Sequence, residues 1–370
     1  MKENIPQFKV SAPGRICLFG EHQDYLGLPV IAAGISKRIA ITGSYRHDNQ
    51  VLINLPDIED CEKITLTWPL PYLKPRDYFR STLNILQRQG LRFSRGLEVM
   101  VNGNIPINSG TSSSSALIVA WISFLLQVAD EPISKSAQQI GELAYAAEVL
   151  EFGEPGGMMD HYSTALGNII YLESEPEIRI EQFTPQLGTF VLGDSLQPKD
   201  TLGILKRVKY GMLEAIRKIK QHHPEFNLPT APLISVPDYR AILSADELKL
   251  LASNIADRDI LRSAKTLLEQ EYTDDLQLGN LLNEHQQNLR EAKQISTSKI
   301  NRMIAAALKS GALGAKINGS GGGGCMFAYA PTNPETVAEA IEQQGGKAYI
   351  INVDAGTRVE SATVQMRVPL

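Results

Sequence analysis

Apolar and polar positions alternate over much of the N-terminal part of the chain, a pattern that predicts β-strands. Residues 8–19 contain two short apolar runs on either side of a Ser-Ala-Pro-Gly sequence, which predicts a turn. Residues 30–41 are expected to form a strand pair and residues 51–67 a β-ribbon. A further strand is expected at residues 96–103, and it leads through a loop of small residues into an apolar helix at 116–128.

Helical spacing of apolar residues, together with short apolar runs, predicts the remaining elements. Expected helices lie at residues 76–89, 134–150, 158–166, 199–222, 245–270, 276–292 and 335–343. Expected strands lie at residues 168–172, 190–194, 316–320, 325–330, 348–353 and 359–368. The second half should therefore consist of helices that cover an antiparallel sheet. A polar, acidic stretch at 173–177 predicts a boundary between domains of residues 1–175 and 176–370.

The composition is that of an ordinary globular protein, with 43% hydrophobic and 21% charged residues. A chain of 370 residues is long enough for two domains and a sizeable core. The net charge of −5 gives no reason to expect nucleic acid or an anionic membrane as a partner. Three widely separated cysteines without a metal-binding spacing, the lack of a signal peptide and the lack of a bilayer-spanning apolar run favour a cytoplasmic protein.

The loop of small residues at 106–117 has the character of an anion site. It lies between a predicted strand and a predicted helix, whose first turn offers unpaired N–H groups and a positive dipole end. Gly110 allows close approach of the backbone to a ligand, and hydroxyls from Ser109 to Ser115 can donate to phosphate or ligate a hard cation. The alternative is an ordinary serine-rich helix cap. The apolar helix directly downstream favours the anion site, although the loop lacks the Gly-Lys-Ser/Thr ending of a Walker A motif.

Ionisable residues gather around the predicted strand at 16–19. Arg15 precedes it, and Glu21, His22 and Asp24 follow it. A strand that ends in such a cluster brings charge to the edge of a sheet, where substrates are often bound. The alternative is a solvated, charged turn, but the apolar strands on both sides favour a cleft.

Two carboxylates further along the chain also stand out. Glu148 lies near the end of an alanine-rich helix, and it needs a cation or an exposed helix end because unpaired buried charge is costly. Asp160 lies at the start of the next predicted helix, where the helix dipole alone could explain it.

A second loop, of four glycines at 321–324, separates two predicted strands. Glycine permits close approach of a ligand without side-chain clash, and a triphosphate needs many backbone donors. Two separate loops of small residues in one chain therefore favour a site for a triphosphate. Trp68 and Tyr78 could flank a nucleotide base, although aromatic residues at such positions more often belong to the core.

Three motifs occur in order along the chain. They are SAPGRICLFGEHQDY at 11–25, PINSGTSSSSA at 106–116 and GAKINGSGGGGC at 314–325. Together they resemble the kinase superfamily named after galactokinase, homoserine kinase, mevalonate kinase and phosphomevalonate kinase (GHMP). The similarity covers roughly residues 8–172 and 280–330. The resemblance implies an α+β, two-domain fold, with an N-terminal domain like ribosomal protein S5 domain 2 and a ferredoxin-like C-terminal α/β sandwich.

Within the superfamily, residues 20–25 and 148–161 look like the sugar-contacting signature and the catalytic segment of galactokinases. The resemblance implies ATP and Mg²⁺ as cofactors and a sugar as substrate, most directly the anomeric C1 hydroxyl of galactose or a related monosaccharide. It implies Asp160 as the catalytic carboxylate and Arg15 as its positively charged partner. The implied substrate-binding residues are Arg15, Glu21, His22, Asp24, Gly157 and Asp160. The implied ATP-binding residues are Ser109, Gly110, Thr111, Ser112, Ser113, Ser114, Ser115, Gly321 and Gly322.

The resemblance also implies that Ser114 and Glu148 ligate magnesium, and it is compatible with a monomer or a homodimer. The chain departs from the family pattern at Thr111, where Leu is usual, at Ser115, where Ala is frequent, and at His161, where Gln is common. The family's sugar-contacting Tyr has no clear counterpart at 199–207. These departures leave the phosphotransfer residues in place.

Two alternatives stay open. The first is a superfamily kinase for a uronic acid, arabinose, another sugar or a mevalonate-type alcohol, and a uronate would need a cation for which Lys37 and Arg38 are candidates. The second is a sugar sensor that binds ATP and sugar without catalysis. Such sensors tend to have lost residues of the serine loop, which this chain retains.

Overall fold

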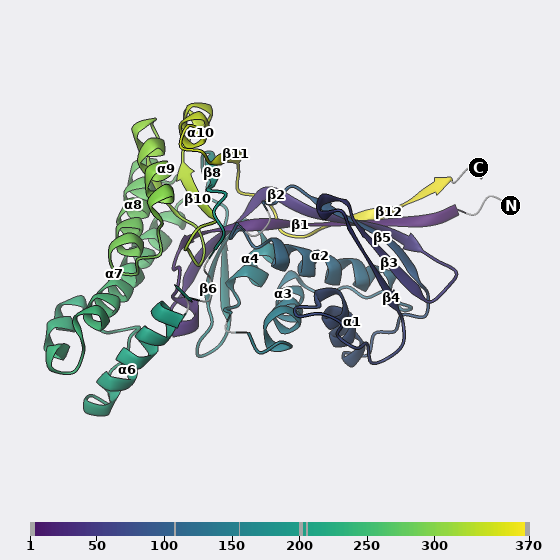
Figure 1. Cartoon of the computed structure of the whole chain (residues 1–370), viewed down its shortest axis with the longest axis horizontal. Helices are drawn as coiled ribbons and strands as arrows, with labels where there is room; N and C mark the ends of the chain where they lie inside the picture. The colour runs from purple at the N-terminus through teal and green to yellow at the C-terminus, as the bar shows by residue number, and fades with distance from the viewer. Residues whose placement is uncertain (1–3, 107–108, 155, 200–202, 205, 367–370) are drawn as a thin grey trace.

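The computed structural model describes residues 4–106, 109–154, 156–199, 203–204 and 206–366. Within them the chain forms an eight-stranded sheet and a four-stranded sheet, each with helices packed against it (Figure 1). This arrangement agrees with the α+β class expected from the sequence.

The larger sheet has the strand order β12-β1-β2-β5-β3-β4, and β6 joins it through β2 and carries β7. Its strands are β1 (Asn4–Phe19), β2 (Val30–Tyr45), β3 (Gln50–Leu55), β4 (Asp60–Thr65), β5 (Leu97–Gly103), β6 (Ile169–Glu173), β7 (Arg179–Phe183) and β12 (Arg358–Met366). Only the pairing of β3 with β5 is parallel among the ladders of the described chain. The expected β-ribbon at 51–67 is confirmed as β3 and β4.

The expected turn near residue 13 is wrong, because β1 is continuous there. Its pairing with β2 shifts register between Pro13 and Arg15, so the Pro-Gly sequence is absorbed as an irregularity within the strand. Proline is tolerated in a sheet at such bulges. Strand β2 is likewise one long strand and not the expected strand pair. Because β1 is continuous, Arg15 and the turn that follows β1 lie in the same region of the protein.

The helices packed on the larger sheet are α1 (Tyr78–Arg88), α2 (Ser113–Val128), α3 (Ala137–Tyr145), which continues as a π-helical turn (Ala146–Leu150), and α4 (Met159–Leu166). Helix α2 is apolar on all sides and lies at the centre of this layer. Its Trp121 is fully buried and stacks on Phe124, and the ring of Phe79 in α1 lies nearly perpendicular to that of Trp121. A helix that is apolar all round is stable only when buried, so the start of α2 is held rigidly.

The smaller sheet is antiparallel, with the order β11-β8-β10-β9. Its strands are β8 (Phe190–Asp194), β9 (Gly314–Ile317), β10 (Cys325–Tyr329) and β11 (Lys347–Ile351). The accompanying helices are α6 (Gly211–His222), α7 (Ala245–Leu268), α8 (Asp275–Glu291), α9 (Ser298–Lys309) and α10 (Pro334–Glu342). Short helical turns are η1 (Asp24–Leu26), η2 (Pro56–Ile58), η4 (Lys206–Tyr210) and η5 (Leu233–Ala241). Helices over an antiparallel sheet are as expected, but α9 was not anticipated.

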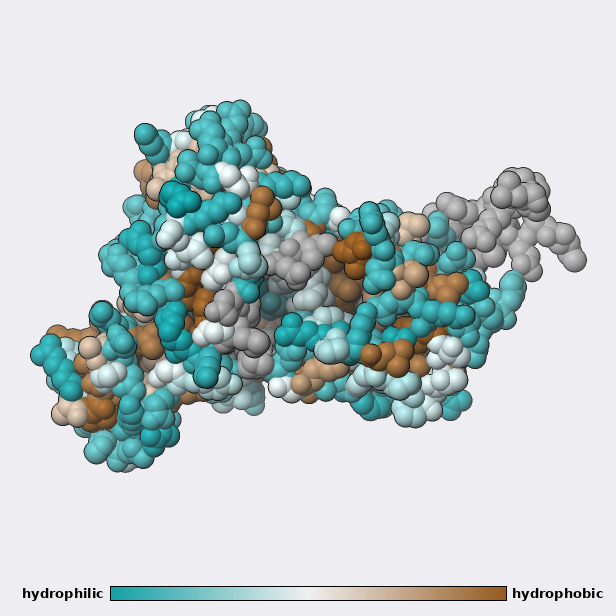
Figure 2. All heavy atoms as spheres, in the orientation of Figure 1, coloured by the Kyte–Doolittle hydropathy of each residue, from teal (hydrophilic) through white to brown (hydrophobic). Residues whose placement is uncertain are grey.

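The division at residue 175 remains a prediction, and the larger sheet extends beyond it. Strand β7 pairs with β6, and β12 returns from the end of the chain to pair with β1. The helix expected at 199–222 falls partly on residues 200–202 and 205, which lie outside the described residues. On the face in Figure 2, hydrophilic residues predominate and apolar ones form small, separate patches. None of the described helices is long and apolar enough to cross a membrane.

Candidate functional site

A polar cavity of about 750 Å³ lies where the two sheets meet. It is bordered by the end of β1, the starts of α2 and α4, the segment after β8 and the loop before β10. The predicted site residues that line it are Arg15, Glu21, His22, Asp24, Gly110, Ser112, Ser113, Ser114, Ser115, Glu148, Gly157 and Asp160. The fold therefore brings together most of the residues that the sequence singled out.

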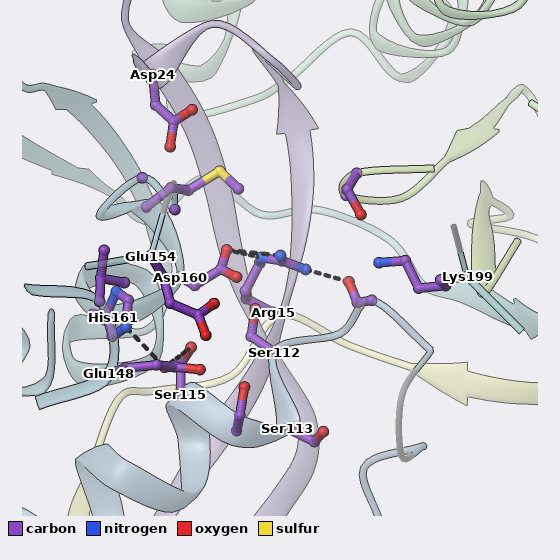
Figure 3. A pocket seen from close by; sticks show the side chains of 18 of the residues that line it. Arg15, Asp24, Ser112, Ser113, Ser115, Glu148, Glu154, Asp160, His161 and Lys199 are labelled. Carbon is purple, nitrogen blue, oxygen red and sulfur yellow. Dashed lines mark hydrogen bonds and ion pairs between the residues drawn. The ribbon is translucent and has the colours of Figure 1, made fainter. Parts of the chain in front are cut away.

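Arg15 and Asp160 form an ion pair at the centre of the cavity (Figure 3). Arg15 Nε donates to Asp160 Oδ1 at 2.7 Å, and Arg15 Nη1 donates to the Gly110 carbonyl at 2.5 Å. Burial raises the pKa of Asp160, but the charges of Arg15 and His161 outweigh it and leave the pKa below its usual value. The Asp160 side chain remains 33% exposed while that of Arg15 is buried. Asp160 is therefore an ionised carboxylate with a face open to a ligand.

The serine loop divides into an inward and an outward part. Ser112 has a left-handed backbone, with φ of 58°, and α2 begins directly after it. The hydroxyls of Ser109 and Thr111 donate to the Pro106 carbonyl at 2.8 and 3.3 Å, so these two side chains stabilise the loop itself. The serines from 112 to 115 line the cavity. Within the loop, the hydroxyls at 112 to 115 are thus the ones placed to contact an anion in the cavity.

Glu148 has partners that the sequence did not identify. Its Oε2 accepts hydrogen bonds from Ser115 Oγ and His161 Nε2, both at 2.8 Å. Burial raises the pKa of Glu148, but His161, Ser114 and Ser115 together lower it below its usual value. The carboxylate at the end of the alanine-rich helix is therefore kept charged. His161, noted only as a departure from the family pattern, is the residue that could have signalled this.

Ser114 and Glu148 both line the cavity and offer hard oxygen donors. The part of the chain that the structure describes contains no group of three or more His, Cys, Asp or Glu side chains suited to a metal. Mg²⁺ is commonly held by one or two protein oxygens together with substrate phosphates and water. The residues present therefore fit the magnesium site that the resemblance implies.

Asp24 lies at the end of the cavity away from the serine loop (Figure 3), and Gly157 lies directly against it. A Cβ at position 157 would overlap Asp24 Oδ2, so only glycine leaves room for this carboxylate. Burial raises the pKa of Asp24 to about 6, and the nearby negative charge of Asp160 adds to the effect. Its Oδ1 accepts from the backbone N–H of Tyr25 at 2.9 Å.

His22 links this end of the cavity to the glycine loop. Its Nδ1 lies 2.7 Å from Tyr25 Oη and its Nε2 lies 3.0 Å from the Ser320 carbonyl. Burial, with the charge of Lys293, lowers the pKa of His22 to about 3, so the ring is neutral. Both ring nitrogens have partners inside the protein, and His22 fixes the wall of the cavity in this structure. Its expected role as a sugar ligand stays a prediction.

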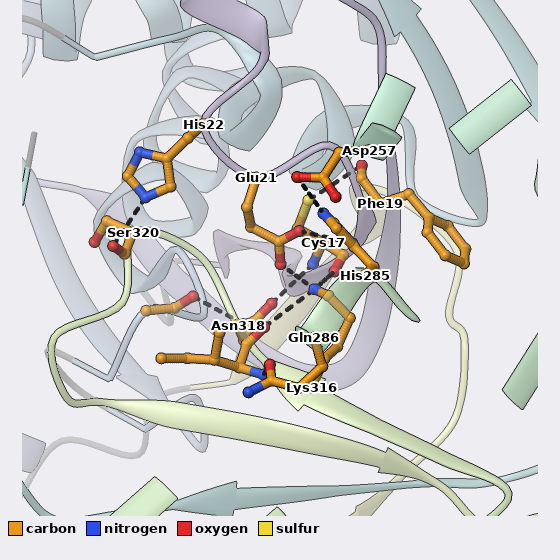
Figure 4. Close-up of polar contacts among 12 residues, drawn as sticks. Cys17, Phe19, Glu21, His22, Asp257, His285, Gln286, Lys316, Asn318 and Ser320 are labelled. Carbon is orange, nitrogen blue, oxygen red and sulfur yellow. Dashed lines mark hydrogen bonds and ion pairs between the residues drawn. The ribbon is translucent and has the colours of Figure 1, made fainter. Parts of the chain in front are cut away.

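Glu21 differs from the other predicted substrate residues, because its carboxylate points into the protein (Figure 4). Its side chain is only 1% exposed, and Oε1 pairs with Lys316 Nζ. Lys316 also donates to the Cys17 carbonyl at 2.9 Å. Glu21 Oε2 lies 3.7 Å from His285 Nδ1, too far for a hydrogen bond. The structure therefore does not aim this carboxylate at a ligand in the cavity.

Glu21 belongs to a buried cluster that comprises Glu21, Asp257, His285, Lys293 and Lys316. Lys293 Nζ donates to Asp257 Oδ2 at 2.7 Å and to the Glu21 carbonyl at 3.1 Å. Burial raises the pKa of Asp257 and lowers that of His285, whose ring is therefore neutral. The cluster ties the turn after β1 to α7, to α8 and to β9.

Other predictions need correction. Gly322 N donates to the Ile295 carbonyl at 2.7 Å, and a Cβ on Gly321 would come within 2.6 Å of Ile295, so these two glycines pack away from the cavity. Gly319 and Ser320 line it instead.

Lys37 and Arg38 are also misplaced as candidates for a cation at the substrate. Lys37 lies over the ring of Tyr349, and Arg38 pairs with Asp354 at 2.9 Å, so neither borders the cavity. A further cavity residue, Lys199, was missed by the sequence analysis. Tyr78, which the sequence offered as a residue beside a nucleotide base, lines the cavity.

Comparison with known families gives three matches in the same chain. Residues 77–168 match the GHMP kinases N terminal domain, and residues 264–348 match the GHMP kinases C terminal domain. Residues 2–45 match the galactokinase galactose-binding signature.

Individual relatives span nearly the whole chain. A mevalonate kinase of Thermococcus onnurineus is 28% identical over 95% of this chain and 97% of its own length. A galactokinase of Haemophilus influenzae is 27% identical over 96% of each chain.

Solved structures share the fold. Lactococcus lactis galactokinase complexed with galactose has a TM-score of 0.83 at 19% identity, covering 95% of both chains. Methanococcus jannaschii mevalonate kinase has a TM-score of 0.70 at 16% identity, covering 94% of this chain and 98% of that one. The chain has the two-domain GHMP kinase fold and belongs to the GHMP kinase superfamily, whose members are phosphotransferases acting on alcohol groups.

Proposed function

We propose that this protein transfers the γ-phosphoryl group of ATP to a hydroxyl of a neutral sugar, most directly the C1 hydroxyl of galactose or a related monosaccharide. The observation that carries the proposal is the placement of the Arg15–Asp160 pair. It lies between the serine loop, which suits phosphate, and the acidic end at Asp24 and Gly157, which suits hydroxyl groups.

The chemistry follows from this placement. An acceptor hydroxyl oxygen attacks the γ-phosphorus, the bond from that phosphorus to the bridging oxygen breaks, and ADP leaves with the electron pair. Asp160, ionised and partly exposed, accepts the hydroxyl proton. Arg15 keeps Asp160 ionised and offsets charge on the transferring group.

Positioning and charge neutralisation carry most of phosphoryl-transfer catalysis. N–H groups at the start of α2 and the hydroxyls of Ser112 and Ser113 would hold the phosphates. Ser114 and Glu148 would hold Mg²⁺, which when bound neutralises charge on the β- and γ-phosphates. Ser115 and His161 keep the Glu148 carboxylate charged and oriented for that purpose.

The acidic end of the cavity favours a neutral acceptor. Asp24 and Asp160 can each accept hydrogen bonds from hydroxyl groups, and the positive charge of Arg15 is already engaged by Asp160. A carboxylate on the acceptor, as in a uronate or mevalonate, would face like charge there. The galactose-binding signature over residues 2–45 supports the same choice.

Phosphorylation of mevalonate is the second candidate, because the mevalonate kinase of Thermococcus onnurineus is as similar to this chain as the Haemophilus galactokinase. The cation that mevalonate would need is not supplied by Lys37 or Arg38. The sugar sensor is disfavoured, because the serines at 112–115, Arg15 and Asp160 all lie in one cavity.

The test is ADP release with Mg²⁺ and ATP against neutral sugars, uronic acids and mevalonate at equal concentration. We expect turnover with galactose or a related neutral sugar and at least about tenfold lower kcat/KM for any carboxylate-bearing acceptor. Turnover confined to mevalonate or a uronate would contradict the proposal. Tight binding of ATP and sugar without turnover would identify a sensor.

A further inference from the structure

Lys199 is a cation of the cavity that none of the assigned roles uses. It lies in the segment after β8, and in Figure 3 its amine end points toward Arg15 and the serine loop. Two glycines leave the space that it occupies. A Cβ on Gly110 would come within 2.8 Å of Lys199 Nζ, and a Cβ on Gly324 would come within 3.0 Å of Lys199 Cδ. The side chain is thus accommodated by both small-residue loops.

The charges around Lys199 leave it without a matching anion. The groups that face it are Arg15 from β1, the neutral ring of His22 after β1, Asp160 from α4 and the thiol of Cys325 next to the glycine loop. Burial and the charge of Arg15 lower the pKa of Lys199 to about 8, against the opposing effect of Asp160. Asp160 is bound by Arg15, and no carboxylate within the described ranges forms an ion pair with Lys199. Two cations that repel each other within one cavity are costly unless a ligand brings negative charge.

We propose that Lys199 is a second catalytic cation, which contacts the phosphate chain of ATP on the opposite side of Arg15 from Asp160 and offsets the charge of the transferring phosphoryl group. The inference rests on the proposed function, since it assigns one further residue to the same transfer. Lys199 takes up no proton in the step and keeps its own throughout.

Phosphate, and not the acceptor, is the ligand that the position favours. Lys199 lies against Gly110, within the loop that opens α2, whereas the acceptor end is marked by Asp24 and Gly157. A cation next to the N–H groups at a helix start can contact the same anion as those groups. It therefore strengthens the binding of that anion.

The experiment compares Lys199→Met and Lys199→Arg with the wild type, with Lys220→Met at the exposed end of α6 as the matched control. Calorimetry with ADP and ATP gives nucleotide affinity without turnover, steady-state kinetics gives kcat and both KM values, and thermal melting checks folding. We expect Lys199→Met to lower kcat about a hundredfold, the scale for one lost charge-stabilising donor, and to weaken nucleotide binding about tenfold. The acceptor KM should stay within about twofold, and Lys199→Arg should recover most of the loss.

A pH series adds a readout that a structural role would not give. Nucleotide affinity of the wild type should fall as the pH rises above about 8, whereas that of Lys199→Arg should not. Unchanged kcat and nucleotide affinity in folded Lys199→Met would overturn the inference, as would a rise confined to the acceptor KM, which would assign Lys199 to an acceptor carboxylate. If the wild type transfers phosphate to no acceptor, the proposed function fails, and the nucleotide affinities alone decide on Lys199.

Discussion

Two sets of opposite charges meet at the end of β1, and they differ in exposure more than in chemistry. Arg15 and Asp160 face a cavity, and the Asp160 side chain is 33% exposed. Glu21, in the turn after β1, and Lys316, in β9, lie beside the same cavity, yet both side chains are buried in the protein. Carboxylates that the sequence presents as equivalent substrate ligands therefore have different surroundings. Exposure, and not charge, separates the Arg15–Asp160 pair from the buried cluster.

The difference teaches what each set can do. The partly exposed Arg15–Asp160 pair leaves one face of a carboxylate open to a ligand. The charged groups of the buried cluster contact only partners inside the protein. Removing one partner from a buried pair leaves an uncompensated charge, which costs far more than breaking an exposed pair. Substitutions in the buried cluster should therefore reduce stability first, and substitutions in the cavity should reduce turnover first.

The largest effect is expected for Lys316→Met, which leaves Glu21 buried without its cation. The free energy of unfolding should fall by about 3 to 5 kcal/mol, measured by urea denaturation. Lys309→Met, at the exposed end of α9, is the control and should change stability by less than about 0.5 kcal/mol. A folded Lys316→Met protein of wild-type stability would show that the cluster does not hold the turn after β1.

Asp160→Asn should have the next largest effect, and on turnover alone. The amide preserves the shape of the side chain but cannot accept the hydroxyl proton, so kcat should fall at least about a hundredfold. The melting temperature and the ATP affinity serve as internal controls and should stay close to those of the wild type. Near-wild-type turnover in the folded variant would remove Asp160 from the catalytic role.

Glu148→Gln should weaken the response to magnesium. Loss of the carboxylate charge should raise the Mg²⁺ concentration for half-maximal activity about tenfold or more. The matched control is Glu142→Gln, an exposed position in α3 of the same helical segment. Superimposable Mg²⁺ titrations for Glu148→Gln and the control would exclude Glu148 from the metal site.

The smallest effect is expected for Asp24→Asn, and it depends on pH. The pKa of Asp24 is raised from 3.8 to about 6 in the folded protein, so its ionisation destabilises the fold progressively between those values. Asp24→Asn should therefore be more stable than the wild type above pH 6, by about 1 to 2 kcal/mol given the partly open site, and equal to it below about pH 4. The acceptor KM should rise at the same time.

This last result would be checked by urea denaturation at several pH values, with the exposed Asp238→Asn as control. A stability difference that is independent of pH would show that Asp24 does not titrate as described. An unchanged acceptor KM would separate Asp24 from the substrate.

The sequence identified the serine loop, Arg15, Asp24 and Asp160 because each belongs to a local motif. It could not show that Glu21 turns inward, since its partner Lys316 is 295 residues distant and no local pattern links the two. It misread β1 because proline and glycine predict a turn unless a neighbouring strand absorbs them as a bulge, which depends on β2.

Helix α9 shows a different kind of miss. Its buried residues Ile300, Met303, Ile304 and Ala307 have regular helical spacing, so the signal was present and was overlooked. Lys199 was missed because a lone lysine in a weakly patterned segment gains meaning only beside Gly110 and Gly324, which lie far from it in sequence.

The central claim, that the Arg15–Asp160 cavity transfers phosphate from ATP to a sugar, is tested most directly by identifying the product. Wild-type protein, ATP, Mg²⁺ and galactose would be incubated, and the position of the new phosphate would be read by ³¹P–¹H correlation NMR. The account predicts galactose 1-phosphate and ADP in equal amounts. Phosphate transferred to mevalonate but to no sugar, or no phosphate ester with any acceptor, would contradict it.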